Sequence, residues 1–193
     1  MLLAMRICLV ILCFALGSTR GSSAETNSTK TNWSVFYSPR GGCTEAVVTA
    51  LALAKTTVLV QAYSFTSAPI AKALVDAHRR GVSVQVILDK SQRTEKYSSA
   101  TFIRNYGIAC YIDSQHAIAH NKVMVIDGKT VLTGSFNFTK AAEEKNAENL
   151  LVLQDAELAM KYTLNWVAHR QHSTLYAGVP EKSRPRKRSR TGR

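Results

Sequence analysis

The sequence has 193 residues, and its 25 Lys and Arg against 13 Asp and Glu give a formal net charge of +12 at pH 7. This length fits one compact domain, and so positive a balance favours a polyanionic partner, either nucleic acid or an anionic membrane surface. Four cysteines in a chain this long exclude a disulfide-rich scaffold.

The first 24 residues are typical of a secretory signal peptide. Arg6 precedes an apolar run from Ile7 to Leu16, and Ala24 ends a stretch of small residues suited to cleavage. The apolar run is too short to span a bilayer as a stable helix, although an uncleaved membrane anchor is the alternative. We therefore expect a signal peptide at 1–24 and a secreted or periplasmic protein.

Removal of the signal would leave Cys43 and Cys110 in an oxidising compartment. The sequence leaves open whether they form one disulfide or remain two buried thiols. No CxxC motif or His/Cys cluster indicates a structural metal. A polar linker is expected at 25–32.

Strand and helix patterns alternate along residues 33–175, which we expect to form the domain. Nearly continuous apolar runs predict strands buried on both faces, and apolar residues at helical spacing predict helices. The expected strands are 33–38, 56–65, 82–89, 108–113 and 148–154, and the expected helices are 44–55, 68–81, 98–107 and 155–170. A β-hairpin is expected at 120–138, with its turn at Gly128 and Lys129. This alternation predicts an α/β fold in which a mixed β-sheet is sandwiched between helices.

Residues 176–193 are expected to form a basic, disordered tail. The segment from Glu181 to Arg193 has seven Lys or Arg residues, one Glu and no apolar periodicity. Such a segment cannot bury enough apolar surface to fold. Its cations either add to the attraction for a polyanion through counterion release or only aid solubility.

The hairpin carries a set of polar residues that can perform phosphoryl chemistry. The set is His120, Lys122, Asp127, Gly134, Ser135, Asn137 and, further along, Glu148. His120 and Lys122 are two apart, so on a strand they point to the same face. An imidazole can attack phosphorus, while Lys122, Ser135 and Asn137 can donate hydrogen bonds to the phosphate oxygens as charge builds on them. A carboxylate such as Glu148 can fix the imidazole tautomer.

The same set does not resemble a cage for a divalent ion, so we expect no metal. The sequence also lacks a Gly-rich phosphate cradle of the Walker or dinucleotide type, so we expect no cofactor.

The pattern H-x-K-x4-D-x6-G-S, with an Asn two residues after the Ser, resembles the signature of the phospholipase D superfamily. With one copy, a short chain and a signal peptide, the sequence is most similar to the small secreted bacterial endonucleases of that family, over about residues 32–170. The resemblance implies a phospholipase D-like fold with one motif per chain. Because the family usually brings two motifs to one site, it also implies a homodimer with a shared site.

The resemblance also implies roles for individual residues. His120 would form a covalent phosphohistidine, Lys122 and Asn137 would bind the phosphate, and Glu148 would orient a histidine. Asp127 and Gly134 would support these groups without touching substrate. Since Lys122 and its symmetry mate would supply the positive charge, no metal would be required.

Three functions are weighed on these grounds. The first is a metal-independent phosphodiesterase that hydrolyses DNA or RNA with little sequence preference. The second is a phospholipase that cleaves a headgroup ester of a membrane phospholipid, since the same chemistry serves both substrates. The third is a catalytically inactive nucleic-acid-binding protein, against which the intact set around His120 counts. No amphipathic segment with an aromatic-rich apolar face stands out, which favours nucleic acid.

The other histidines are interpreted as surface groups. His116 either widens the phosphate site or is a partly exposed loop residue. Solvated helix faces are expected for His78, His169 and His172, which lie beside arginines. Residues 63–65 end a strand where such folds place substrate-facing loops, so they are weak candidates for substrate contacts.

Overall fold

Within residues 32–178, which the computed structural model describes, eight strands form one mixed sheet. The strands are β1 (Asn32–Ser38), β2 (Thr57–Ala62), β3 (Ser83–Asp89), β4 (Ala109–Asp113), β5 (Lys122–Ile126), β6 (Thr130–Gly134), β7 (Glu148–Gln154) and β8 (Thr174–Leu175). Their order across the sheet is β1-β7-β6-β5-β2-β3-β4-β8. The β2–β3 and β3–β4 pairs are parallel and the other pairs are antiparallel.

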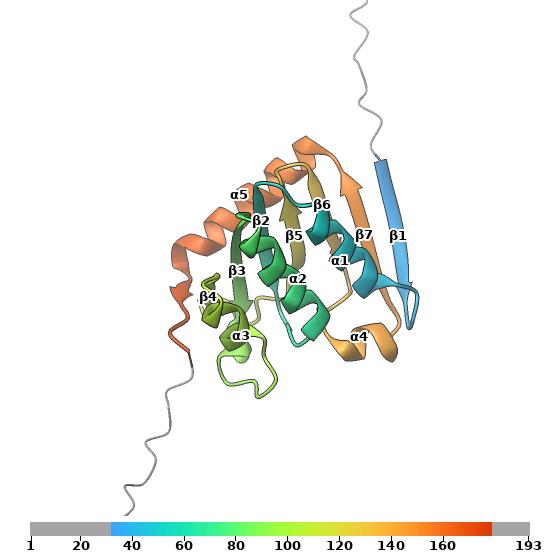
Figure 1. The fold of residues 1–193 in the computed structure, drawn as a ribbon. Coiled ribbons are helices and arrows are strands. Elements are labelled where there is room, and N and C mark those ends of the chain that lie inside the picture. The colour runs from blue at the N-terminus through green and yellow to red at the C-terminus, as the bar shows by residue number, and fades with distance from the viewer. Residues whose placement is uncertain (1–31, 179–193) are drawn as a thin grey trace, which may run out of the picture. The chain divides into compact units, whose positions relative to one another are not determined.

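Helices cover both faces of this sheet. They are α1 (Cys43–Leu53), α2 (Ala68–Arg79), α3 (Ala100–Asn105), α4 (Lys140–Glu144) and α5 (Ala156–His172), with a short 3-10 helix η1 (Lys90–Arg93). In Figure 1, α1 and α2 lie on one face and α5 lies on the other. The expected α/β fold with a mixed sheet between helices is therefore confirmed. None of the helices between residues 32 and 178 is long and apolar enough to cross a membrane.

The sequence of β5 is almost continuously apolar because both faces of this strand are buried. Val123 and Val125 pack in a cluster with Ala159 of α5. Met124 and Ile126 point to the opposite face and join the main core, which includes buried side chains of α1 and α2. Because successive side chains of a strand alternate between faces, a strand covered on both faces needs apolar residues at every position.

The boundaries differ from the expected ones at a few points. The second strand ends at Ala62 rather than at residue 65, and η1, α4 and β8 were not anticipated. Asn32, expected in the linker, pairs with Gln154 as the first residue of β1. The expected signal at 1–24, the rest of the linker and the basic residues beyond 178 lie outside the described residues.

Packing continues past residue 175, where we expect the domain to end. Tyr176 is 5% exposed, its hydroxyl lies 2.9 Å from Thr101 Oγ1, and its backbone N–H donates to the Cys110 carbonyl at 2.8 Å. Tyr176 is thus part of the core rather than of a disordered tail. The sequence left open whether Cys43 and Cys110 form a disulfide or remain free. In the structure both are buried free thiols.

Candidate active site

The sheet brings the start of β5, the end of β6 and the start of β7 to one edge, because these three strands are antiparallel neighbours. A pocket of about 430 Å³ lies at this edge. It is lined by His120, Lys122, Gly134, Ser135, Asn137 and Glu148. All the residues expected to be catalytic or to bind substrate therefore line one pocket.

Side-chain alternation after β6 presents two of these residues to the pocket. Phe136 and Phe138 are fully buried in the core, and Phe138 forms a β-bridge with Phe65. Ser135 and Asn137 alternate with these phenylalanines and line the pocket. Burial of the two aromatic side chains thus anchors the polar segment between them.

Lys122 is held in a buried position with its ammonium group at the pocket. The residue is only 7% exposed, and Nζ donates a hydrogen bond to the His120 carbonyl at 2.8 Å. Nζ also lies 5.3 Å from the centre of the Tyr63 ring. Burial lowers the pKa of Lys122, and the negative charge of Glu148 acts in the opposite direction.

The His120 imidazole is exposed and packs against Tyr63, with the ring centres 4.6 Å apart. Glu148 Oε1 accepts a hydrogen bond from Asn146 Nδ2 at 3.0 Å. Within residues 32–178 of a single chain, no hydrogen bond joins His120 to Glu148. The orientation of a histidine by Glu148 is therefore not formed within one chain.

Asn137 and Ser135 differ in the hydrogen bonds that their side chains already make. The side-chain oxygen of Asn137 is buried and has no hydrogen-bond partner among the described residues. Ser135 Oγ already accepts from the Asn149 backbone N–H at 3.0 Å. A buried polar group without a partner is costly, and this oxygen can only accept, so a phosphate oxygen would be met by the Nδ2 group of Asn137 instead.

The segment that carries His120 is fixed by groups that sequence reasoning missed. Asp89, at the end of β3, is buried, and its Oδ2 accepts from the Ala119 N–H at 2.8 Å. The Tyr63 N–H donates to the Asn121 carbonyl at 2.8 Å. An acidic residue that ends a buried apolar strand was the available signal for Asp89. Of the weak candidates at 63–65, Tyr63 contacts the site and Phe65 is core.

Asp127 does not lie at this pocket, which corrects the expectation that it supports the catalytic groups. It occupies the turn at the opposite end of β5, with φ 53°. Its carboxylate accepts hydrogen bonds from the backbone N–H groups of Lys55, Thr56 and Thr57 at 2.7–3.0 Å. Burial raises the pKa of Asp127, but these hydrogen bonds outweigh it and the net effect is a lowered pKa. Asp127 therefore braces the connection between α1 and β2.

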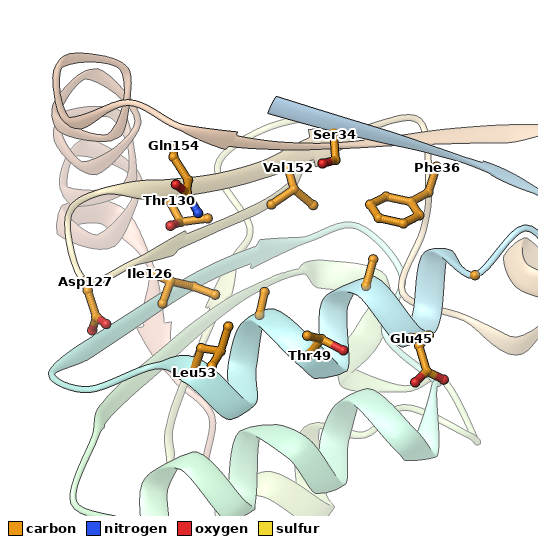
Figure 2. A pocket seen from close by; sticks show the side chains of 13 residues that line it. Ser34, Phe36, Glu45, Thr49, Leu53, Ile126, Asp127, Thr130, Val152 and Gln154 are labelled. Carbon is orange, nitrogen blue, oxygen red and sulfur yellow. The ribbon is translucent and has the colours of Figure 1, made fainter. Parts of the chain in front are cut away.

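A second hollow, a groove of about 440 Å³, lies between α1 and the sheet (Figure 2). Its lining includes Phe36, Leu53 and Val152, and its charged residues are the carboxylates Glu45 and Asp127. It contains no Lys, Arg or His. A phosphodiester would meet only like charge there, so the pocket at His120 is the candidate active site.

The expectation of solvated faces for His169 and His172 is wrong. Both imidazoles, together with that of His116, surround the carboxylate of Asp113, which is fully buried. None of these four residues lines the pocket at His120. His116 is nevertheless a partly exposed loop residue, as one of the two readings held.

Residues 47–166 match the family described as "Cardiolipin synthase, PLD-like domain". A phospholipase D of Rickettsia bellii is 42% identical over 137 residues, which cover 71% of this chain and 68% of that protein. A mitochondrial cardiolipin hydrolase of Xenopus laevis is 37% identical over 100 residues, which cover 52% of this chain and 48% of that protein.

Two solved structures share the fold over nearly their whole length. Nuc from Salmonella typhimurium, a phospholipase D family member, is 41% identical with a TM-score of 0.74, covering 76% of this chain and 99% of that one. NucT from Helicobacter pylori is 26% identical with a TM-score of 0.71, covering 76% of this chain and 100% of that one.

Proposed function

This chain belongs to the phospholipase D superfamily as a member with one motif, and on that premise we propose that it is a metal-independent endonuclease that hydrolyses DNA or RNA. Hydrolysis of a phosphodiester bond is the chemistry of the superfamily. The choice of nucleic acid rests chiefly on one observation. The lining of the pocket at His120 is polar throughout, apart from Gly134, and contains the cation Lys122.

In the first proposed step, the His120 imidazole attacks phosphorus and forms an N–P bond while the bond to the leaving oxygen breaks. A second imidazole gives its proton to that oxygen. Lys122 and Asn137 donate hydrogen bonds to the non-bridging oxygens, on which charge builds. Ser135 borders the same phosphate and contributes its hydroxyl. In the second step, the second imidazole takes a proton from water, whose oxygen attacks phosphorus and releases His120.

The second imidazole is proposed to be His120 of another copy of the chain. One chain supplies one motif and one histidine to this pocket. A two-fold dimer brings identical surfaces together and doubles every residue of the site. His120 is exposed at the sheet edge, where a second copy can reach it. In the dimer, Glu148 is proposed to accept a hydrogen bond from a histidine, a bond that is not formed among residues 32–178 of one chain.

The net charge of +12 adds to the preference for a long polyanion. Similarity to Nuc over 99% of that chain supports placing the protein with the single-motif members of the superfamily. Secretion or a periplasmic location, proposed from residues 1–24, would expose the enzyme to extracellular nucleic acid.

The alternative substrate is a membrane phospholipid. Relatives at 42% and 37% identity are named phospholipase D and mitochondrial cardiolipin hydrolase. The same steps cleave a phospholipid headgroup ester, because the attacked phosphodiester is chemically equivalent.

A single preparation tests the choice of substrate. Plasmid DNA, single-stranded RNA, and vesicles of phosphatidylcholine or cardiolipin are each supplied in excess EDTA, and products are followed over time. We expect cleavage of nucleic acid and no release of headgroup or phosphatidate. Turnover of vesicles with intact plasmid would overturn the nuclease assignment and favour the lipid substrate.

The matched control is His120→Asn, which keeps the size and polarity of the side chain but removes the nucleophile. It should abolish every activity that belongs to this site. Activity of the purified variant equal to that of the wild type would contradict the proposed nucleophile.

A further inference from the structure

Four side chains that the proposed reaction does not use converge at the end of β4. Asp113 is the last residue of β4, and His116 lies on the loop that follows. His169 and His172 lie in the last turn of α5, three residues apart and therefore on one helix face. The sheet and α5 thus join two short sequence pairs, D-x2-H and H-x2-H, into one cluster.

The donor atoms of the cluster are closely spaced. Asp113 Oδ2 lies 2.7 Å from His169 Nδ1, 3.1 Å from His116 Nδ1 and 3.2 Å from His172 Nε2. One ligand atom from each of the four residues can be chosen so that all lie within 4.8 Å of one another. In a tetrahedral zinc site with bonds of about 2.0–2.1 Å, neighbouring ligand atoms are about 3.3 Å apart. Small rotations of the rings would reach this spacing.

The framework holds the cluster in place. Asp113 is 0% exposed, and its Oδ1 also accepts from the Gln115 N–H at 3.1 Å. The Trp166 Nε1–H donates to the Val60 carbonyl at 2.9 Å, which fixes α5 against the sheet one turn before His169. The Arg170 guanidinium stacks over the Tyr111 ring at 3.5 Å. The two helical histidines are therefore presented by a rigid element.

We propose that Asp113, His116, His169 and His172 bind one transition-metal ion, of which zinc is the best fit. Three imidazoles and one carboxylate are ligands that Zn²⁺ accepts in tetrahedral geometry. Mg²⁺ and Ca²⁺ prefer sites made of oxygen atoms, and Cu⁺ prefers thiolates, which this cluster lacks. Four protein ligands leave no open position, so the site is structural rather than catalytic.

The ion would tie together three parts of the chain that lead to the active site. It would link β4 and the end of α5 to the loop from Ser114 to Asn121. That loop carries His120, and at its other end it is held by Asp89 through Ala119. The side chain of His116 is 43% exposed, and within residues 32–178 its ring forms hydrogen bonds with Asp113 of the cluster. The proposed ion would therefore stabilise the end of this loop that carries His116, while Asp89 still holds the end that carries His120.

Metal content of the full chain, purified without a polyhistidine tag, tests this proposal. The protein is stripped with a strong chelator, and Zn²⁺ is then titrated in competition with a chromophoric chelator. We expect one zinc per chain. The double variant His169→Asn/His172→Asn should bind zinc at least about 100-fold more weakly, since loss of outer hydrogen-bond partners alone costs about 10–100-fold. The matched control His120→Asn should still bind one zinc.

If the wild type takes up no zinc, or if all three proteins bind it equally, the proposal is wrong. Because the double variant also removes contacts to a buried carboxylate, the single variant His116→Asn on the exposed loop provides a second measurement. Co²⁺ bound to the wild type should give the visible absorption of a tetrahedral ion, and His116→Asn should alter that spectrum. An unchanged spectrum would exclude His116 as a ligand. These readouts do not depend on the proposed nuclease activity.

Discussion

Gly134 lies so close to Asn149 that a Cβ atom on residue 134 would stand 2.3 Å from the Asn149 backbone oxygen. Gly134 also has φ 149°, a conformation that side-chain-bearing residues rarely adopt. This contact lets β6 and β7 pack closely beside Ser135 and Glu148, which line the active-site pocket.

Gly134→Ala should therefore lower both stability and activity. The added methyl group forces β6 and β7 apart, and the unfavourable φ alone costs at least about 1 kcal/mol. Gly128→Ala is the matched control, because Gly128 has φ 61° with no atom within 4 Å of the added Cβ. Chemical denaturation and plasmid cleavage measure the two effects. Equal activity in the two variants would contradict the role given to the contact with Asn149.

Asp127→Asn should reduce stability without changing the chemical step. The carboxylate receives three backbone N–H groups and the Thr56 hydroxyl, and Asn keeps the shape and tolerates the positive φ of this position. We expect a loss of about 2 kcal/mol in the free energy of unfolding at pH 7, since hydrogen bonds to a charged group are worth about 1.5–3 kcal/mol. Single-turnover cleavage should be unchanged, because Asp127 lies at the other end of β5.

The stability difference between wild type and Asp127→Asn should depend on pH. The folded-state pKa of Asp127 lies below its ordinary value of 3.8, so the charged form is favoured by folding. Its contribution is present above about pH 4 and is lost as the pH falls through the folded pKa. A difference that stayed constant down to pH 2 would show that the charge of Asp127 is not responsible.

The alternating fold was predictable from the sequence, because it follows from local patterns. The residues around His120 could be named from the motif, but the pocket that they line depends on the pairing of β5, β6 and β7. The predicted hairpin places His120 and Lys122 at the start of a strand. Because side chains alternate along extended backbone, burial of Phe136 and Phe138 in the core directs Ser135 and Asn137 to the pocket. The prediction for Asp127 was wrong because a motif gives only the order of residues along the chain. The length of β5 separates Asp127 from the pocket at His120.

The cluster around Asp113 was not predictable by the same reasoning. Its histidines come from a loop and from the end of α5, and each looks like a solvated residue within its own element. They meet only because α5 crosses the face of the sheet and β8 then pairs with β4. The spacing of apolar residues predicts that a segment is helical, but it does not predict which edge of the sheet the end of that helix lies beside.

Removal of the Glu148 charge should lower the pKa of Lys122 further. Burial already lowers this pKa, and Glu148 opposes that effect. The His120→Ala variant is expected to bind DNA without cleaving it. As the pH rises, its DNA affinity should decline when Lys122 loses its proton, and adding Glu148→Gln should move the midpoint of this decline to a lower pH. Glu144→Gln in the same background is the control, since it removes an exposed carboxylate paired with Lys140. Identical pH profiles for the two variants would rule out the Glu148–Lys122 coupling.

The shared site predicts a dimer in solution. Light scattering should give twice the chain mass, and refolding wild type with an excess of His120→Ala chains should reduce activity below that of the same amount of wild type alone. The loss arises because most wild-type chains would then face a partner without an imidazole at position 120. A monomer that retains full activity at nanomolar concentration would exclude the shared site.

A strong chelator should separate the two roles that a metal can have in this protein. Plasmid cleavage at 25 °C should persist, because Lys122 rather than a bound ion stabilises the charge in the proposed reaction. The thermal midpoint of unfolding should fall by about 5 °C or more and should recover with Zn²⁺, since an ion held at 100 times its Kd contributes about 2.7 kcal/mol. The variant His169→Asn/His172→Asn should show no such shift. Cleavage that was lost with the chelator and restored by Mg²⁺ would refute the proposed mechanism, whereas a midpoint insensitive to both chelator and Zn²⁺ would refute the zinc site.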